Sequence, residues 1–400
     1  MTKLIMTLSV MMFFSSAFAS SPILADAKLL KKLQIPIIST QADLNIGFAR
    51  VSEADKERIS RTAHETGKCG GYQELEQVNE QTVFEDFKVS LAREKKYLNF
   101  KKSLVKNFRF SQFDPKIRDA VREVSDSEIG NWVSWLAGFG GRFHASSNPN
   151  KHTVALADKL RQMVSGLAYP ATVTLVQHRR TQQSSVRLHL EGSTRPHEIV
   201  VLGGHLDSIN WSYFGDKNQA PGADDNASGS GALLEALRVL LKQGQPERSI
   251  ELMFYAAEEV GLYGSTEISG EYKAAGKDVV AVLQLDMTMH PGSGENVISS
   301  ETDFTSAWLR DLLLEWNKNY LNVKIIADEC GYACSDHAPW YKNGYSTLMP
   351  FESHTDKMNS KIHTPNDTLN SSSSLKHAAI FSKIAVIFAM DLANSNMRQP

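Results

Sequence analysis

The stretch Arg248–Gly264, RSIELMFYAAEEVGLYG, decides the fold of this chain. Its apolar run at 252–257 has the length of a strand, and such a run bounded by turn residues is typical of a strand buried on both faces of a parallel sheet. The run ends at Glu258 and Glu259, and glycines follow. An isolated Glu-Glu pair is usually solvated on a loop. Two carboxylates at the end of a buried strand must instead reach water or be neutralised by a positive charge.

Other segments repeat this pattern of an apolar strand that ends in His, Asp or Glu. Residues 198–202 lead into His205 and Asp207, residues 279–285 lead into Asp286, and residues 347–349 lead into Glu352 and later His363. In an open α/β sheet, ligands bind beyond the carboxyl ends of the strands. The repeated endings therefore predict a metal site assembled at one rim of the sheet.

Composition limits the class of protein. The chain has 400 residues, of which 42% are hydrophobic, so it can bury one large core. A net charge of −2 gives no basic excess for nucleic acid, and no apolar run is long enough to span a membrane. Strands alternate with helical patterns, which predicts an α/β three-layer sandwich: a mostly parallel central sheet with helices on both faces.

The N-terminus reads as a targeting segment. Lys3 precedes an apolar run at 4–14, and Ala17-Phe18-Ala19 is a cleavage signal, which predicts a signal peptide at 1–19 and an exported protein. Residues 20–114 are rich in charged residues and basic pairs towards their end. We expect a small, partly helical pro-segment that is removed; the alternative is an N-terminal domain that stays attached. The catalytic domain is expected at 115–400.

Cysteine usage fits export. Cys330 and Cys334 frame the sequence CGYAC, and a short-loop disulfide is the better interpretation in an oxidising compartment. Cys69 has no partner and lies in the segment expected to be removed.

Local signals place helices around the strands. Ser125 and Glu128 form a capping box, and further helices are expected at 153–163, 304–317 and 375–393, with strands at 172–176 and 186–190. The loop 221–231, PGADDNASGSG, opens onto a helix. It lacks a phosphate-binding glycine pattern, and its two aspartates favour a cation.

The candidate metal ligands are two imidazoles and three carboxylates, a set that suits zinc: His205, Asp224, Glu259, Asp286 and His363. If one carboxylate bridges, two ions about 3.5–4 Å apart would each have three protein ligands. Asp207, two residues after His205, is placed to orient that imidazole. Glu258 is then available as a general base, which predicts hydrolysis of an acyl or amide bond.

Several motifs together resemble one family. They are HLDS at 205–208, PGADDNASG at 221–229, AAEEVGL at 256–262, LQLDMT at 283–288, CGYACSDH at 330–337, MPFES at 349–353 and IHTPNDT at 362–368. In this order and spacing they resemble the secreted bacterial leucyl aminopeptidases with two zinc ions. The resemblance covers about 115–395.

The resemblance implies a role for each matching residue. Asp224 would bridge two zinc ions, with His205 and Asp286 on one ion and Glu259 and His363 on the other. Glu258 would be the acid/base, and Tyr332 would help to stabilise the tetrahedral intermediate. The Asp224–Asp225 peptide bond would be cis.

The same resemblance implies the partners. Substrates would be peptides or proteins with a free N-terminus, and the pro-segment would act as inhibitor and chaperone of a monomeric enzyme.

The implied pocket for the N-terminal residue of the substrate is apolar, and Met287, Met349, Phe351 and Ile362 match it. The segment 353–361 departs from the family, because Thr355 and Met358 stand where leucine-preferring relatives have aromatics, with His354 and Asp356 nearby. A carboxylate at the pocket mouth would favour a Lys or Arg side chain. Preference for Leu or another large apolar residue, or for Lys or Arg, stays open.

Two other functions compete with an aminopeptidase. One is a glutaminyl cyclase-like acyltransferase on a related fold, which would use one zinc ion. The other is a binding module that has lost its site, but no ligand or base is missing from this sequence.

Overall fold

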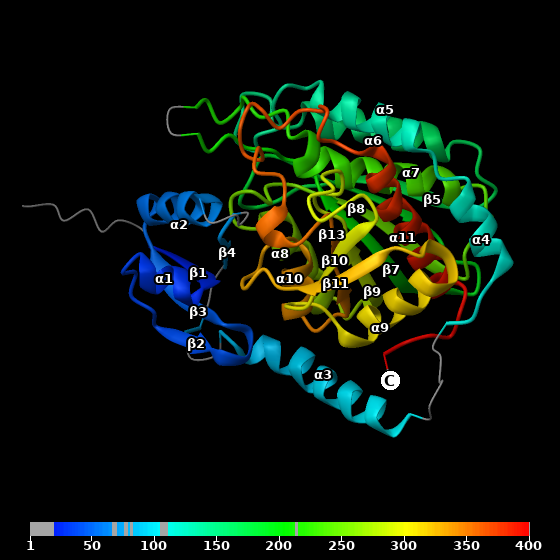
Figure 1. The fold of residues 1–400 in the computed structure, drawn as a ribbon, viewed down its shortest axis with the longest axis horizontal. Helices are drawn as coiled ribbons and strands as arrows, with labels where there is room; N and C mark the ends of the chain where they lie inside the picture. Colours follow the sequence, from blue (N-terminus) through cyan, green and yellow to red (C-terminus); the bar gives the residue numbers. More distant parts are fainter. Residues whose placement is uncertain are drawn as a thin grey trace, which may run out of the picture.

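The computed structural model describes residues 20–65, 70–75, 79–80, 83–104, 111–212 and 215–399. The predicted signal peptide at 1–19 and Cys69 lie outside these residues. Two parts are visible in Figure 1: a small N-terminal unit, and a larger body built around a central sheet.

The central sheet confirms the predicted fold class. Its six strands run in the order β12-β9-β7-β8-β6-β5. Their bounds are Thr347–Leu348 (β12), Asp278–Gln284 (β9), Arg195–His205 (β7), Arg248–Tyr255 (β8), Ser185–Leu190 (β6) and Ala171–Val176 (β5). Strands β12, β9, β7 and β8 are parallel. At one edge β6 pairs antiparallel with β8, and β5 pairs antiparallel with β6.

Side-chain alternation in the central strands explains the three layers. In β7, Val200 and Leu202 join the main apolar core, while Ile199 and Val201 join a separate cluster on the opposite face. The main core contains α5 (Asp126–Ala137), α6 (Lys151–Val164), α7 (Gly229–Leu240), α9 (Ala307–Trp316) and α11 (Leu375–Ala393). The opposite face is covered by α8 (Tyr263–Ala274) and α10 (His337–Lys342). Both faces of the parallel strands are therefore buried.

The helices follow the sequence signals closely. Ser125 is the N-cap of α5 and accepts a hydrogen bond from the Glu128 amide, as the capping box predicts. Helix α11 spans the predicted residues and packs against α7 and the central sheet. Within the described residues, we find no helix with the length and apolar character that crossing a membrane requires.

Shorter elements complete the body. They are α4 (Pro115–Arg122), the π-helical turn η2 (Ala223–Ser228), η3 (Asn317–Leu321), η4 (Thr355–Lys357), and a small sheet of β11 (Lys324–Asp328), β10 (Val297–Glu301) and β13 (Pro350–Phe351). In this sheet Ser299 pairs with Phe351, so β10 lies beside the predicted pocket residues.

The N-terminal unit has more strand than we predicted. An antiparallel sheet in the order β2-β3-β1-β4 is formed by β1 (Ser21–Asp26), β2 (Ser39–Gln41), β3 (Ile46–Val51) and β4 (Tyr72–Glu74). It carries α1 (Ala27–Lys32), η1 (Ala42–Leu44) and α2 (Glu53–Glu65). The prediction rested on the polar stretch 72–113, whereas the buried strand patterns lie earlier, at 21–26 and 46–51.

Helix α3 (Glu85–Ser103) connects the unit to the body and runs along the body's edge (Figure 1). Its Tyr97 is fully buried in the main core, and its Glu94 accepts a hydrogen bond from the Ala307 amide at the start of α9. Helix α3 is therefore packed against the body.

Candidate metal centre

Three parallel strands bring the candidate residues to one edge. His205 is the last residue of β7, Glu258 and Glu259 follow the end of β8, and Asp286 follows the end of β9. Because these strands are neighbours in parallel register, their carboxyl ends lie side by side. The convergence that the strand endings predicted is present in the structure.

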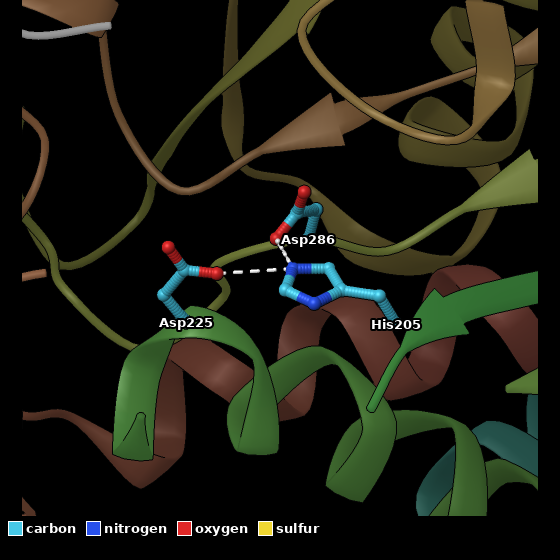
Figure 2. A group of neighbouring side chains, drawn as sticks. All are labelled: His205, Asp225 and Asp286. Carbon is cyan, nitrogen blue, oxygen red and sulfur yellow. Dashed lines mark hydrogen bonds and ion pairs between the residues drawn. The ribbon is translucent and has the colours of Figure 1, made fainter. Parts of the chain in front are cut away.

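Two groups of potential ligand atoms share one carboxylate. His205, Asp225 and Asp286 form the first group, and Asp225, Glu259 and His363 form the second; the atoms of each group lie within 4.8 Å of one another. Asp225 Oδ1 is 3.0 Å from His205 Nε2, and its Oδ2 is 3.0 Å from His363 Nε2. In Figure 2, carboxylate oxygens of Asp225 and Asp286 both face the same ring nitrogen of His205, Nε2.

The prediction that Asp224 is the shared ligand is wrong. In this structure its neighbour Asp225 belongs to both ligand groups. Asp224 Oδ1 accepts from the Met289 amide at 3.1 Å, and its Oδ2 accepts from Asn359 Nδ2 at 3.0 Å. Adjacent residues of a turn point to different sides, and the Asp-Asp sequence alone cannot tell which one faces the histidines. The cis peptide bond is shifted by the same one residue, to Asp225–Asn226.

The remaining ligands pair across the centre. His205 Nε2 is 3.2 Å from Asp286 Oδ1, and His363 Nε2 is 2.8 Å from Glu259 Oε2. All of these side chains are buried. The Nε2 atom of each imidazole therefore faces two carboxylates, one of which is the shared Asp225.

Asp207 supports two parts of the centre. Its Oδ1 lies 3.6 Å from His205 Nδ1, and its backbone oxygen is 3.1 Å from the same nitrogen. The carboxylate also accepts from the amides of Glu258 at 2.9 Å and Glu259 at 3.2 Å. Asp207 thus lies behind His205, as predicted, and additionally fixes the turn that carries both glutamates.

Glu258 lies buried beside the two groups without belonging to either. Burial and the neighbouring carboxylates, first Asp286 and then Asp336, raise the pKa of Glu258 well above its usual range, against the opposing effect of His205. Its Oε2 has no hydrogen-bond donor among the described residues. A carboxylate in this position suits proton transfer at a reacting group.

The buried carboxylates of the centre favour a bound cation. Burial raises the pKa of Glu259 to about 8, with Asp225 adding to the effect. Burial disfavours the charged form of His363, but Glu259 and Asp225 outweigh it and raise its pKa to about 10. The imidazoles would therefore hold protons to offset the carboxylates. Divalent cations would offset the charge of the same carboxylates, and His, Asp and Glu are ordinary zinc ligands. The residues present therefore fit two such ions.

Two supporting residues were not predicted from the sequence. Asp367 accepts from the amides of both Asp224 and Asp225, each at 3.0 Å, and so holds the turn that presents the shared carboxylate. Ser335 Oγ donates to Asp286 Oδ2 at 2.6 Å. Both residues lie inside motifs quoted above, but their roles depend on contacts between distant segments.

A cavity of about 260 Å³ opens beside the centre. Its lining includes Asp286 together with Met287, Tyr332, Met349 and Phe351. Ile362 is fully buried in the same apolar cluster and is not on the cavity wall. Thus four of the five predicted substrate-binding residues line one cavity, and the fifth supports it.

The Cys330–Cys334 disulfide, which we predicted, forms part of the same wall. Thr355, Asp356 and Met358, where the sequence departs from the family, also line the cavity, as does Glu329. The cavity wall therefore combines apolar side chains with carboxylates.

The N-terminal unit contributes to the cavity as well. Asp26, Lys28 and Asn45 are among its lining residues. The space beside the candidate centre is thus bounded by both parts of the molecule.

Comparison with known proteins defines the class. Residues 185–388 match the model of peptidase family M28, and the chain belongs to this family. This confirms the predicted enzyme class, a hydrolase that acts on peptide bonds.

Individual relatives carry matching names. A probable leucine aminopeptidase of Arthroderma otae is 39% identical over 244 residues, which cover 59% of this chain and 65% of that protein, just under two thirds of its length. The probable aminopeptidase YDR415C of Saccharomyces cerevisiae is 32% identical over 285 residues, 70% of this chain and 76% of that protein. The recognised family is therefore confirmed at the level of M28 aminopeptidases, although these relatives are fungal and not bacterial.

A solved structure agrees over nearly the whole length. The LapA aminopeptidase of Legionella pneumophila has a TM-score of 0.76 and 24% identity, covering 94% of this chain and 99% of that one. At this identity the likeness shows the fold, including the N-terminal unit, and no more.

Proposed function

We propose that this chain is an exported metallo-aminopeptidase that uses two zinc ions and Glu258 to release the N-terminal residue of peptides with a free amino terminus. The observation that carries the proposal is Asp225, whose two oxygens lie 3.0 Å from His205 and from His363. A carboxylate shared in this way can hold two ions side by side. Asp286 and Glu259 would complete the two ligand sets.

Two ions in these positions would supply Lewis acidity, which polarises a peptide carbonyl and acidifies water. Glu258 would take a proton from the attacking water and deliver it to the leaving amine. Asp207 would keep His205 in the required tautomer and hold the Glu258 amide in place. Tyr332, which lines the same cavity as Asp286, would stabilise charge on the carbonyl oxygen.

The cavity supports recognition of one residue. Met287, Met349 and Phe351 offer an apolar wall for Leu or another large apolar side chain. Glu329 and Asp356 on the same wall support the alternative, a Lys or Arg side chain, through opposite charge. Both preferences remain part of the proposal, and the substrate panel below separates them.

We also propose that residues 20–114 are an inhibitory pro-segment. Glu74 N donates to Gly261 O at 3.1 Å, directly behind the glutamate turn, and Tyr72 Oη donates to Val260 O at 3.3 Å. Together with Asp26 and Lys28 at the cavity, these contacts would limit access of a peptide chain until the segment is removed.

Export rests on the predicted signal peptide at 1–19 and is supported by the disulfide, which is a feature of oxidising compartments. The enzyme is expected to act as a monomer.

The test is a panel of Leu-, Phe-, Lys- and Arg-p-nitroanilides, each with a free and with an acetylated amino group. The proposal predicts turnover of the free substrates only, its loss with a chelator, and its return with zinc. Turnover of acetylated substrates, or turnover that survives the chelator, would contradict it.

A second substrate addresses the cyclase-like acyltransferase. The relatives named above carry the name aminopeptidase, so this alternative is kept only as an outcome of the assay. Conversion of an N-terminal glutaminyl peptide to its cyclised product, with no p-nitroaniline released from the panel, would favour it.

A further inference from the structure

The turn between β8 and α8 that carries both glutamates is held by side chains from other segments. Four consecutive backbone N–H groups, at 256–259, each donate to a side-chain oxygen. The first donates to Ser185 Oγ at 2.9 Å and the second to Gln183 Oε1 at 3.0 Å, while the third and fourth donate to Asp207. These N–H groups lie beyond the end of β8 at Tyr255. The carbonyl oxygens of Ala256 and Ala257 accept from the amides of Gly264 and Tyr263, each at 3.0 Å, so the side chains add to the turn's own backbone hydrogen bonds.

The second residue of the turn is in a conformation that needs support. Ala257 has a φ of +52°, in the left-handed region that alanine rarely adopts. It directly precedes Glu258, so a return of Ala257 to an ordinary φ would turn both glutamates away from the centre. Gln183 accepts from the amide of this residue. Unusual backbone of this kind persists only where surrounding contacts fix it.

Gln183 can fix the turn because its own orientation is fixed. The side chain is fully buried, and its Nε2 donates to Arg142 O at 2.9 Å and to Pro149 O at 3.3 Å. With the amide nitrogen committed to two carbonyls, the oxygen must face Ala257. If the amide were flipped, its NH₂ group would face the Ala257 N–H, and its oxygen would face the carbonyl oxygens of Arg142 and Pro149.

Arg142 extends the same framework to the other ligand loops. Its buried guanidinium donates to Leu206 O at 2.7 Å and to Gly222 O at 2.9 Å. Leu206 follows His205, and Gly222 lies three residues before Asp225. The residue that anchors Gln183 therefore also touches the loops that present a histidine and the shared carboxylate.

We propose that Gln183 is a positioning residue for Glu258 and Glu259. It touches neither substrate nor metal, and it acts by holding the Ala257 peptide so that the two glutamates face the centre. Ser185, on the neighbouring N–H of the turn, supports the same geometry. The catalytic consequence rests on the proposed aminopeptidase function, whereas the effect on metal coordination does not.

The test compares Gln183→Met with Gln177→Met in the full chain, processed as the wild-type protein is. Methionine has a similar volume but cannot accept the Ala257 amide. Gln177 is a matched control, because it lies on the same strand connection, is exposed, and donates to Ser184 Oγ and not to the glutamate turn. Ser185→Ala, with Ser184→Ala as its control, is a milder second variant.

Two readouts are measured for each variant. The first is kcat and KM on the preferred p-nitroanilide. The second is the visible absorption spectrum of the Co²⁺-loaded chain, which reports coordination by Glu259. For Gln183→Met we expect kcat to fall about 10- to 100-fold with KM within about twofold, since a misplacement of about 1 Å costs up to 100-fold. The Co²⁺ spectrum should change, and the control should match wild type.

The outcomes separate the two claims. A Gln183→Met protein with wild-type kcat and an unchanged Co²⁺ spectrum would overturn the positioning role. If Gln183→Met does not fold, the Ser185→Ala variant decides. An unchanged kcat and an unchanged Co²⁺ spectrum in Ser185→Ala would overturn the claim that side chains hold the turn in place. Absence of turnover in the wild-type protein would contradict the proposed function, and the Co²⁺ comparison would still decide the role of Gln183.

Discussion

Asp225 and Asp224 are adjacent carboxylates with different roles in this structure, and exchanging each for asparagine separates those roles. Asp225→Asn removes the charge shared between His205 and His363, so each proposed zinc ion keeps one imidazole and one carboxylate in place of three protein ligands. Changes to groups that merely support a ligand cost about 10- to 100-fold in metal affinity. Loss of a shared ligand should cost at least about 100-fold for the pair, roughly 2.8 kcal/mol.

Asp224→Asn is the matched control. Its side-chain oxygen can still accept from the Met289 amide, but its new NH₂ group would face the Asn359 amide nitrogen, which now donates to Asp224 Oδ2. One buried donor would lose its partner, which costs about 1–3 kcal/mol of stability. Zinc affinity should change by less than about tenfold, since Asp224 belongs to neither ligand group.

The assay is competition for zinc with a chromogenic chelator, combined with thermal unfolding of the metal-free proteins. We expect Asp225→Asn to lose zinc binding and Asp224→Asn to lose mainly thermal stability. The reverse pattern, with zinc lost in Asp224→Asn and retained in Asp225→Asn, would refute the geometry and restore the assignment that the sequence first suggested.

Three further predictions concern the candidate metal centre and the N-terminal unit. Glu258→Gln should lower kcat about 10²- to 10⁴-fold with both zinc ions retained, as a general base predicts; unchanged turnover would remove that role. Glu74→Gln, which weakens the contacts with Lys56 and Arg180, should raise the activity of the unprocessed chain, whereas unchanged activity would argue against inhibition by this unit. Burial opposes ionisation of Glu74, but Lys56 and Arg180 outweigh it and lower its pKa. The docked unit should therefore be stable above a pH of about 4.5 and become more sensitive to proteases as the pH falls further; protease sensitivity that does not change with pH would contradict this.

The sequence predicted those parts of the molecule that local pattern controls. The apolar runs that form β7, β8 and β9, the capping box of α5 and the long apolar helix α11 all lie where periodicity and end signals put them. The site residues that end these strands were predictable for the same reason, because parallel strands share one edge.

The remaining features depend on contacts between distant segments. No spacing rule tells which of two adjacent aspartates faces the histidines; that follows from Asp367, Met289 and Asn359, which hold the turn. The N-terminal sheet was missed because the polar composition of 72–113 dominated the prediction, whereas β1 and β3 lie earlier in the chain. Gln183 gave no signal in sequence, since its role appears only when β6 lies beside the glutamate turn.

The most direct measurement of the central claim is a zinc-binding isotherm of the metal-free full chain. We predict saturation at two zinc ions per chain. We also predict that hydrolysis of a free-amine p-nitroanilide by the matured protein is absent without metal and appears as zinc is added. Saturation at one ion, or full hydrolysis by the metal-free protein, would contradict a two-metal aminopeptidase.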